Sequence, residues 1–230
     1  MIRLENLKKS FLFRGERKVV ANNLNVTFPT GVSVGLLGRN GAGKSTLLRM
    51  IAGAMEPDSG RIRTYGTISW PVGLAGGFHH DLTGAQNVRF IARVYGVDTD
   101  ELLYFVESFA ELGMHFHQPV RTYSSGMRAR LGFGVSMGIR FDTYLVDEVT
   151  SVGDEIFKNK AQALFKERMR NAGAIVVTHA PPMMRQMCEA GAVLVDGNLH
   201  YFDDVGEAIA FHFEVMHQQN LARQAQGRVG

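Results

Sequence analysis

A glycine-rich loop between an apolar run and a helix-forming run constrains this chain more than any other stretch. Residues 38–46 read Gly-Arg-Asn-Gly-Ala-Gly-Lys-Ser-Thr; residues 32–37 before them predict a buried strand, and residues 47–51 after them predict a helix. Glycines let backbone N–H groups turn toward an anion, and a helix N-terminus adds partial positive charge there. Lys44 would reach the β- and γ-phosphates of a nucleotide, and the Ser45 hydroxyl would ligate Mg²⁺. The full pattern after a strand disfavours the other interpretation, an ordinary glycine-rich turn.

The composition fits one large α/β domain or two small ones. The chain has 230 residues, 45% of them hydrophobic and 20% charged, which is typical of soluble globular proteins. No apolar run approaches the ~20 residues that span a bilayer, and residues 1–6 alternate like a strand instead of forming a secretory signal. We expect the chain to stay in the cytoplasm, so another polypeptide must supply the spans for any membrane process it serves.

Charge and cysteine content argue against a nucleic-acid-binding protein and against a disulfide-bonded one. The net charge of +3 is mild, and the basic residues gather only locally at 14–18 and 121–130, which argues against nucleic-acid binding. Cys188 is the single cysteine, so an intrachain disulfide is excluded and a reducing compartment is expected. We interpret Cys188 as a small buried apolar residue, not as a nucleophile.

Apolar strands alternate with helical patterns over most of the chain. This alternation predicts an α/β fold with a mainly parallel, buried sheet. Together with the phosphate-binding loop at residues 38–46, it indicates the P-loop NTPase (RecA-like) class. An N-terminal antiparallel β subdomain and an inserted helical subdomain complete the expected fold. Strands are expected at residues 2–7, 19–28, 32–37, 61–69 (as a strand or a hairpin), 143–147, 174–178, 192–196 and 199–202; helices are expected from the loop to about 53, within 81–114, and at 123–139, 155–170 and 182–190.

The same pattern suggests domain boundaries. We expect a single domain over residues 1–220: residues 1–74 and 136–210 form the catalytic core with the β subdomain, residues 75–135 the helical subdomain, and residues 211–230 a C-terminal helix and tail. The glycine-rich residues 70–78 are expected to break regular structure, and the polar residues 221–230 to fray. Ile209, Phe213 and Met216 share a helical face that packs on the core or, less favoured, binds a partner.

A second nucleotide signal is an apolar strand that ends in two acids. Residues 143–146 are followed by Asp147 and Glu148. In phosphate-loop proteins the strand beside the loop's own strand ends in an acid that holds Mg²⁺, and Asp147 is the candidate. Glu148, just beyond, could accept a proton from an attacking water. The alternative is a surface acid pair at a strand end.

Two further groups would face the same phosphates. His179 follows the apolar run 175–177 and would lie at the same carboxyl edge of the sheet, where its imidazole could donate to a γ-phosphate; a structural histidine is the alternative. Ser124, Ser125 and Gly126 precede another helix and offer a second anion-ready N-terminus, unless they only cap that helix. Since one nucleotide does not need two cradles, a symmetric dimer could use the second cradle on the partner's nucleotide.

Taken together, these motifs resemble the nucleotide-binding subunits of ATP-binding cassette (ABC) transporters over essentially the whole chain. Residues 38–46 resemble the Walker A motif, and residues 123–127 (Tyr-Ser-Ser-Gly-Met) occupy the place of the family's signature motif. Residues 143–148 resemble Walker B with the catalytic glutamate, residues 152–154 the D-loop, and His179 the switch histidine. The resemblance implies that two copies close head-to-tail over two ATP molecules with Mg²⁺.

The resemblance also implies roles for individual residues. Glu148 would polarise the attacking water, His179 would hold Glu148 and the γ-phosphate in geometry, and Ser45 with Asp147 would hold the metal. Phe11 resembles the aromatic residue that stacks on adenine, with Phe13 as the second choice. The implied ATP-binding residues are Phe11, Gly38, Asn40, Gly41, Gly43, Lys44, Ser45, Thr46, Ser124, Ser125, Gly126 and Asp154.

Two departures from the family pattern narrow the subfamily. The signature has Ser125 where glycine is usual and Met127 where glutamine is usual, and residues 69–78 stand where a Q-loop glutamine belongs, with Gln86 too late to replace it. These segments resemble the ATPases of polysaccharide exporters, above all the capsular polysaccharide export ATPases of Gram-negative bacteria, with O-antigen and teichoic-acid exporters as alternatives. A non-transport ABC ATPase and a lone phosphate-loop kinase or GTPase are less consistent with the motifs.

The resemblance implies partners and a location. Expected partners are a second copy of the chain, an integral-membrane permease and periplasmic or outer-membrane export components, with no nucleic acid. The chain would be a peripheral protein on the cytoplasmic face of the inner membrane. The surface that couples to the permease would be residues 70–80 and the nearby helices.

Overall fold

Two β-sheets make up the larger lobe, and the N-terminal residues form the first. The computed structural model of the chain describes residues 1–13, 15–72, 77–147, 155–178 and 180–226. An antiparallel sheet has the strand order β2-β1-β4, built from β1 (Ile2–Phe13), β2 (Glu16–Phe28) and β4 (Ser59–Thr64). Alternation along β1 buries Ile2 and Leu4 on one face, and the register shifts before Leu7, around Asn6 with its φ of 51°.

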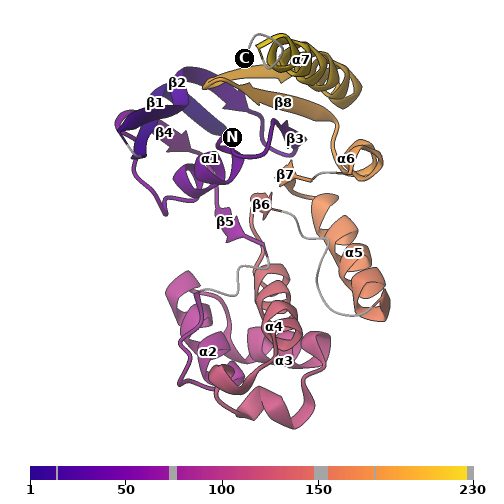
Figure 1. Ribbon diagram of the computed structural model, residues 1–230. Coiled ribbons are helices and arrows are strands. Elements are labelled where there is room, and N and C mark those ends of the chain that lie inside the picture. Colours follow the sequence, from indigo (N-terminus) through magenta and orange to yellow (C-terminus); the bar gives the residue numbers. More distant parts are fainter. Residues whose placement is uncertain (14, 73–76, 148–154, 179, 227–230) are drawn as a thin grey trace.

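The second sheet has six strands in the order β5-β6-β7-β3-β8-β9 (Figure 1). All neighbours run parallel except β9, which pairs antiparallel with β8. Every residue of β3 and β7 is buried, as expected for parallel strands covered on both faces. The α/β fold predicted from the sequence is confirmed. The strands are β3 (Ser33–Leu37), β5 (Ile68–Pro71), β6 (Thr143–Asp147), β7 (Gly173–Val177), β8 (Ala190–Val195) and β9 (Asn198–Phe202).

One expected neighbour in this sheet is wrong. From the sequence, the strand that ends at Asp147 is expected directly beside β3, but β7 lies between β6 and β3. Asp147 therefore pairs with Val177 of β7. The reason is topological: a crossover helix carries the chain from β6 to β7, and the order along the chain does not reveal on which side the later strand adds.

Helix α1 (Lys44–Ile51) joins the two sheets through one apolar cluster. Leu47 and Leu48 of the helix pack in the same cluster as Leu4 and Phe28 of the antiparallel sheet and Leu36 of β3. Because α1 begins directly after the glycine-rich loop, this burial holds the loop in place relative to both sheets.

The other face of the six-stranded sheet is covered by later helices. These are α5 (Glu155–Met169), α6 (Pro181–Met187) and α7 (Val205–Gln226). They contribute Phe157, Met184 and Ile209 to one large apolar cluster with the sheet. Helix α4 (Ser125–Gly138), which belongs to the helical lobe, joins the same cluster through Phe133.

The C-terminal helix α7 is longer than the sequence suggested. It continues to Gln226, so residues 221–226 belong to the helix, and the expected boundary at 210/211 lies inside it. Ile209 is buried, whereas Phe213 of the same predicted face is largely exposed. Within the described residues, no helix combines the length and apolar character needed to cross a bilayer.

A separate helical lobe lies between β5 and β6 in the chain. Figure 1 shows α2 (Gly84–Tyr95), α3 (Thr99–Ala110) and α4 grouped away from the two sheets. Two short 3₁₀ helices, η2 (Gly113–His117) and η3 (Val120–Thr122), complete the lobe. Asp98 caps α3, since its carboxylate accepts from the N–H groups of Asp100 and Glu101.

Two segments before this lobe differ from their sequence-based description. Residues 61–69 do not form one strand or hairpin, because β4 and β5 belong to different sheets and a turn at Gly66, with φ of 92°, separates them. Trp70 and Pro71 extend β5 instead of breaking regular structure. Phe11 and Phe13 lie within β1, not between strands, because the turn around Gly15 is tight and β1 and β2 pair as far as Phe13 and Glu16.

Candidate functional site

The glycine-rich loop has the backbone conformation that its sequence requires. Gly38, Gly41 and Gly43 all have positive φ, of 150°, 77° and 111°. A Cβ on Gly43 would also lie 2.2 Å from a methyl carbon of Val20. Glycine alone tolerates both the positive φ and the close approach of Val20 at this position. The loop can therefore pass close to β2 at the start of α1.

Lys44 folds back over the loop that precedes it. Its ammonium group donates to the carbonyl oxygen of Gly38 at 2.7 Å and to that of Arg39 at 3.1 Å. The residue is only 9% exposed. A cation is therefore held at the mouth of a loop lined with backbone N–H groups, which is the charge distribution that favours a phosphate.

An open cleft of about 400 Å³ lies beside the loop. Eight of the residues singled out in the sequence line it together: Phe11, Asn40, Gly41, Gly43, Lys44, Ser45, Thr46 and Asp147. They come from β1, the loop, α1 and β6, so the fold gathers segments that are more than a hundred residues apart. Gly38 does not line this cleft; its carbonyl holds Lys44 instead.

Sequence reasoning missed three further lining residues, Lys18, Val20 and Val177. Lys18 is the cross-strand partner of Phe11 in the β1–β2 hairpin. The pairing of Phe13 with Glu16 sets this register, because residues 11 and 18 each lie two positions further along their strands.

The cleft also contains the oxygen ligands that Mg²⁺ prefers. The Ser45 hydroxyl and the Asp147 carboxylate line the same space, at the start of α1 and the end of β6. Mg²⁺ characteristically takes only one or two protein oxygens and completes its shell with water and substrate phosphates. The two oxygen donors of Ser45 and Asp147 fit that sparse mode of binding.

The second predicted cradle lies away from this cleft. Ser124 is the N-cap of α4, and its hydroxyl accepts from the Met127 N–H at 3.2 Å, so it caps its own helix as the alternative interpretation required. Tyr123 anchors this turn, because its buried hydroxyl donates to the His115 carbonyl at 2.7 Å, and burial raises the pKa of the Tyr123 hydroxyl. Ser125 and the capping Ser124 are exposed, and neither they nor Gly126 line the cleft in this chain.

Four predicted positions lie outside what the structure describes. Glu148, Asp154 and His179 are not among the described residues, and the side chain of Phe13 is also undescribed. Their assigned roles therefore remain predictions. Phe11 is described, is 39% exposed, and lines the cleft.

Gln86 caps helix α2 and does not line the cleft. It is the third residue of α2, and its side-chain oxygen accepts from the Thr83 N–H at 2.9 Å. The Thr83 hydroxyl in return accepts from the Gln86 N–H, which completes a capping box. Gln86 is thus committed to starting α2, in line with the sequence-based view that it does not replace a Q-loop glutamine.

A second hollow, of about 270 Å³, lies on another side of the loop. It is bounded by Lys18, Arg39, the turn between β8 and β9, and residues of α7. Here the Arg39 guanidinium donates to the Gln219 side-chain oxygen at 3.0 Å, and the Gln219 amide donates to the Asp196 carboxylate at 3.3 Å. No sequence motif pointed to these contacts, which tie the C-terminal helix to the loop.

Comparisons with known proteins agree with this geometry. The family model described as "ABC transporter" matches residues 21–151. The polysialic acid transport ATP-binding protein KpsT of Escherichia coli is 51% identical over 212 residues, covering 91% of this chain and 95% of that protein. The capsule polysaccharide export ATP-binding protein CtrD of Neisseria meningitidis serogroup B is 41% identical, covering 92% of this chain and 98% of that protein.

A solved structure shares the fold at low sequence identity. The ATP-binding cassette MJ0796, in a dimeric post-hydrolysis state bound to ADP and phosphate, superposes with a TM-score of 0.75. The alignment covers 89% of this chain and 99% of that one, at 21% identity. At this identity the likeness bears on the fold alone.

Proposed function

Since this chain belongs to the ABC transporter family of ATPases, we propose that it binds ATP with Mg²⁺ and hydrolyses it in a dimer of two copies, driving export of a capsular polysaccharide. One observation supports the proposal that two copies act as a dimer. The loop, Lys44, Ser45 and Asp147 line one cleft, while Ser124, Ser125 and Gly126 start a helix in the other lobe. A second copy placed head-to-tail would bring its own residues 124–126 to the open side of that cleft.

Different residues of the cleft would bind different parts of a nucleotide. The loop N–H groups and Lys44 would bind the phosphates, with Asn40, Gly41, Gly43 and Thr46 shaping the loop. Phe11 would stack on the base at the far side of the cleft. Ser45 and Asp147 would hold Mg²⁺, which when bound neutralises phosphate charge that develops during transfer.

Hydrolysis needs a water that loses a proton as it attacks. Glu148 follows directly after Asp147, at the end of a strand that lines the cleft, and we assign to it the acceptance of that proton. We assign to His179 a hydrogen bond to the γ-phosphate, since it comes two residues after Val177, the partner of Asp147. Asp154 would line the interface between copies.

The proposed partners follow from the family and from the relatives' names. Transport needs a permease in the membrane, and the chain would act as a peripheral protein at the cytoplasmic face of the inner membrane. Periplasmic and outer-membrane export components would complete the path. The relatives' names say polysialic acid and capsule polysaccharide, which favours such a cargo over O-antigen or teichoic acid.

A mixing experiment tests the shared site. Lys44→Ala disables the loop, and Gly126→Asp places a carboxylate at residue 126. An added Cβ there would meet only the Ser124 hydroxyl, at 3.9 Å, so the fold should tolerate it. Each variant alone should be inactive. An equimolar mixture should recover about a quarter of the wild-type ATPase rate, since about half of randomly paired dimers are mixed and each has one intact site.

The matched control for that experiment is Gly126→Ala, which adds a methyl group without charge and should stay active. If the loop and residues 124–126 instead served a nucleotide in one chain, the mixture would remain as inactive as its components, and the proposal of a shared site would be wrong.

A further inference from the structure

The strand that carries Phe11 loses its third neighbour just before that residue. β1 pairs with β4 only as far as Lys8 and Ser59, whereas it pairs with β2 out to Phe13 and Glu16. From Ser10 onward the hairpin is therefore a two-stranded ribbon. Such ribbons twist strongly and are marginally stable by themselves, so the place of Phe11 over the cleft depends on how the ribbon is anchored.

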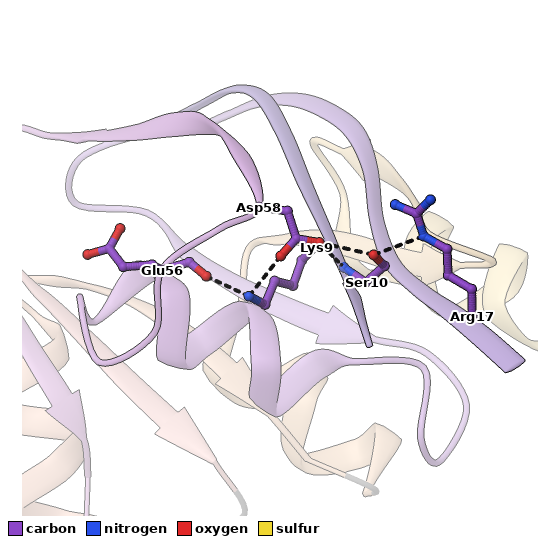
Figure 2. A network of polar contacts seen from close by, with 5 residues as sticks. All are labelled: Lys9, Ser10, Arg17, Glu56 and Asp58. Carbon is purple, nitrogen blue, oxygen red and sulfur yellow. Dashed lines mark hydrogen bonds and ion pairs between the residues drawn. The ribbon is translucent and has the colours of Figure 1, made fainter. Parts of the chain in front are cut away.

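Asp58 is the anchor at the point where the ribbon leaves the sheet (Figure 2). One carboxylate oxygen accepts from the Ser10 N–H at 2.7 Å and from the Ser10 hydroxyl at 3.0 Å; the other accepts from the Lys9 ammonium at 3.0 Å. The Asp58 N–H donates to the Lys8 carbonyl at 2.8 Å. Three consecutive residues before Phe11 are thus bonded to this one aspartate.

Two further contacts extend the anchor to both strands and to the Phe11 ring. Lys9 also donates to the Glu56 carbonyl at 2.8 Å, and its ammonium lies 5.4 Å from the centre of the Phe11 ring. Arg17 of β2 donates to the Ser10 hydroxyl at 3.1 Å, as Figure 2 shows. The hydrogen bonds from Lys9 and Ser10 hold the pKa of the Asp58 carboxyl below its usual range, so it stays ionised at neutral pH.

The anchor also links the two ends of the cleft. Asp58 lies in the turn that follows α1, the helix that presents Lys44 and Ser45 on the phosphate side. We infer that Asp58 is a positioning residue for the nucleotide base, which sets the place of Phe11 relative to the phosphate-binding loop through Lys9 and Ser10. This inference rests on the proposed function, because it assumes that Phe11 stacks on the base.

The test compares a ligand that has a base with one that has none. Binding of ATP and of inorganic tripolyphosphate, both with Mg²⁺, is measured on the full chain carrying Asp58→Ala. We expect ATP to bind about three- to tenfold more weakly, the range of one aromatic contact, and tripolyphosphate to bind as to wild type. Asp58→Asn keeps one acceptor oxygen, so its affinity for ATP should lie between that of the wild type and that of Asp58→Ala.

The matched control is Glu5→Ala. Glu5 is another β1 carboxylate in a network of ion pairs, with Arg3, Arg61 and Arg63, but at the end of the strand remote from Phe11. This variant should bind both ligands as wild type does. If Asp58→Ala weakened the binding of ATP and of tripolyphosphate equally, the substitution would have damaged the whole site, and the inference would be overturned.

A double variant separates this inference from the proposed function. If Asp58 acts through Phe11, then Asp58→Ala should add no further loss of ATP affinity in a Phe11→Ala background. Additive losses would overturn the positioning role, as would an unchanged ATP affinity in Asp58→Ala when Phe11→Ala alone weakens binding. No effect of Phe11→Ala itself would overturn both the stacking assignment and the inference.

Discussion

Arg39, in the glycine-rich loop, donates a hydrogen bond of 3.0 Å to Gln219, which lies 180 residues later in the C-terminal helix. Gln219 in turn donates to Asp196 in the turn between β8 and β9. The loop is therefore braced from outside the nucleotide cleft, by an element that carries none of the nucleotide motifs.

The first prediction concerns this brace. Gln219→Ala should lower the free energy of unfolding by about 1 kcal/mol, the usual net contribution of a hydrogen bond, and should speed amide exchange in the last turns of α7. Urea unfolding and hydrogen exchange measure the two effects. Gln218→Ala is the control, because Gln218 bonds only to Glu214 within the same helix in the described contacts. Equal effects of both variants would show that the contact with Arg39 adds nothing.

The second prediction concerns Lys44. Lys44→Ala should weaken ATP binding by about 10- to 100-fold, because a hydrogen bond between charged groups contributes about 1.5–3 kcal/mol. Titration calorimetry measures the affinity, and circular dichroism checks that the chain remains folded. Lys8→Ala, at an exposed position of β1, should bind ATP normally. Unchanged affinity in folded Lys44→Ala would remove this residue from the phosphate site.

The third prediction concerns Trp70, which lies at the junction of the two lobes. Its ring packs 4.9 Å from that of Tyr95 in α2 and 5.6 Å from that of Phe141, just before β6. Trp70→Ala should therefore cost about 2–4 kcal/mol of stability and weaken polysaccharide export, while ATP affinity changes less than about twofold, because Trp70 does not line the cleft.

Export in cells and ATP titration of the purified chain measure these two effects. Trp70→Phe keeps an aromatic ring in the cluster and should retain most of the stability and export. A strong loss of ATP affinity in folded Trp70→Ala would show that this segment belongs to the nucleotide site and not to the coupling surface.

The fourth prediction concerns Cys188, which is buried as its sequence context suggested. Burial raises the pKa of the Cys188 thiol to about 12. Between the pKa of an unfolded thiol, about 8.5, and about 12, the unfolded state loses a proton that the folded state keeps, so this contribution to stability falls as the pH rises through that window.

Thiol labelling at pH 8.5 measures the consequence. The native chain should react far more slowly than the chain in denaturant, at a rate set by local opening. Cys188→Ala should lose less stability between pH 9 and pH 11 than wild type. Immediate labelling of the native chain would contradict the buried position.

How far the sequence predicts this molecule depends on how local each signal is. The phosphate-binding loop needs only neighbouring residues, since its glycines, Lys44 and the flanking strand and helix are contiguous, and the structure forms it as expected. The cap at Asp98 and the strand that ends at Asp147 are local in the same sense.

Spatial relationships between distant segments were not predictable in this way. The insertion of β7 between β6 and β3 and the contact of Gln219 with Arg39 both depend on tertiary packing. The anchor at Asp58 belongs to the same group, because Asp58 reads in the sequence as an ordinary turn residue between Pro57 and Ser59.

We propose that the loop is half of a nucleotide site and that a second copy of the chain completes it. Sedimentation of Glu148→Gln with ATP and Mg²⁺ measures this directly, because the variant should bind ATP without turnover and accumulate the closed dimer. We predict a dimer with ATP, a monomer with ADP, and a monomer with ATP when Gly126→Asp is added. A Glu148→Gln chain that binds ATP and yet sediments as a monomer would rule out the shared site.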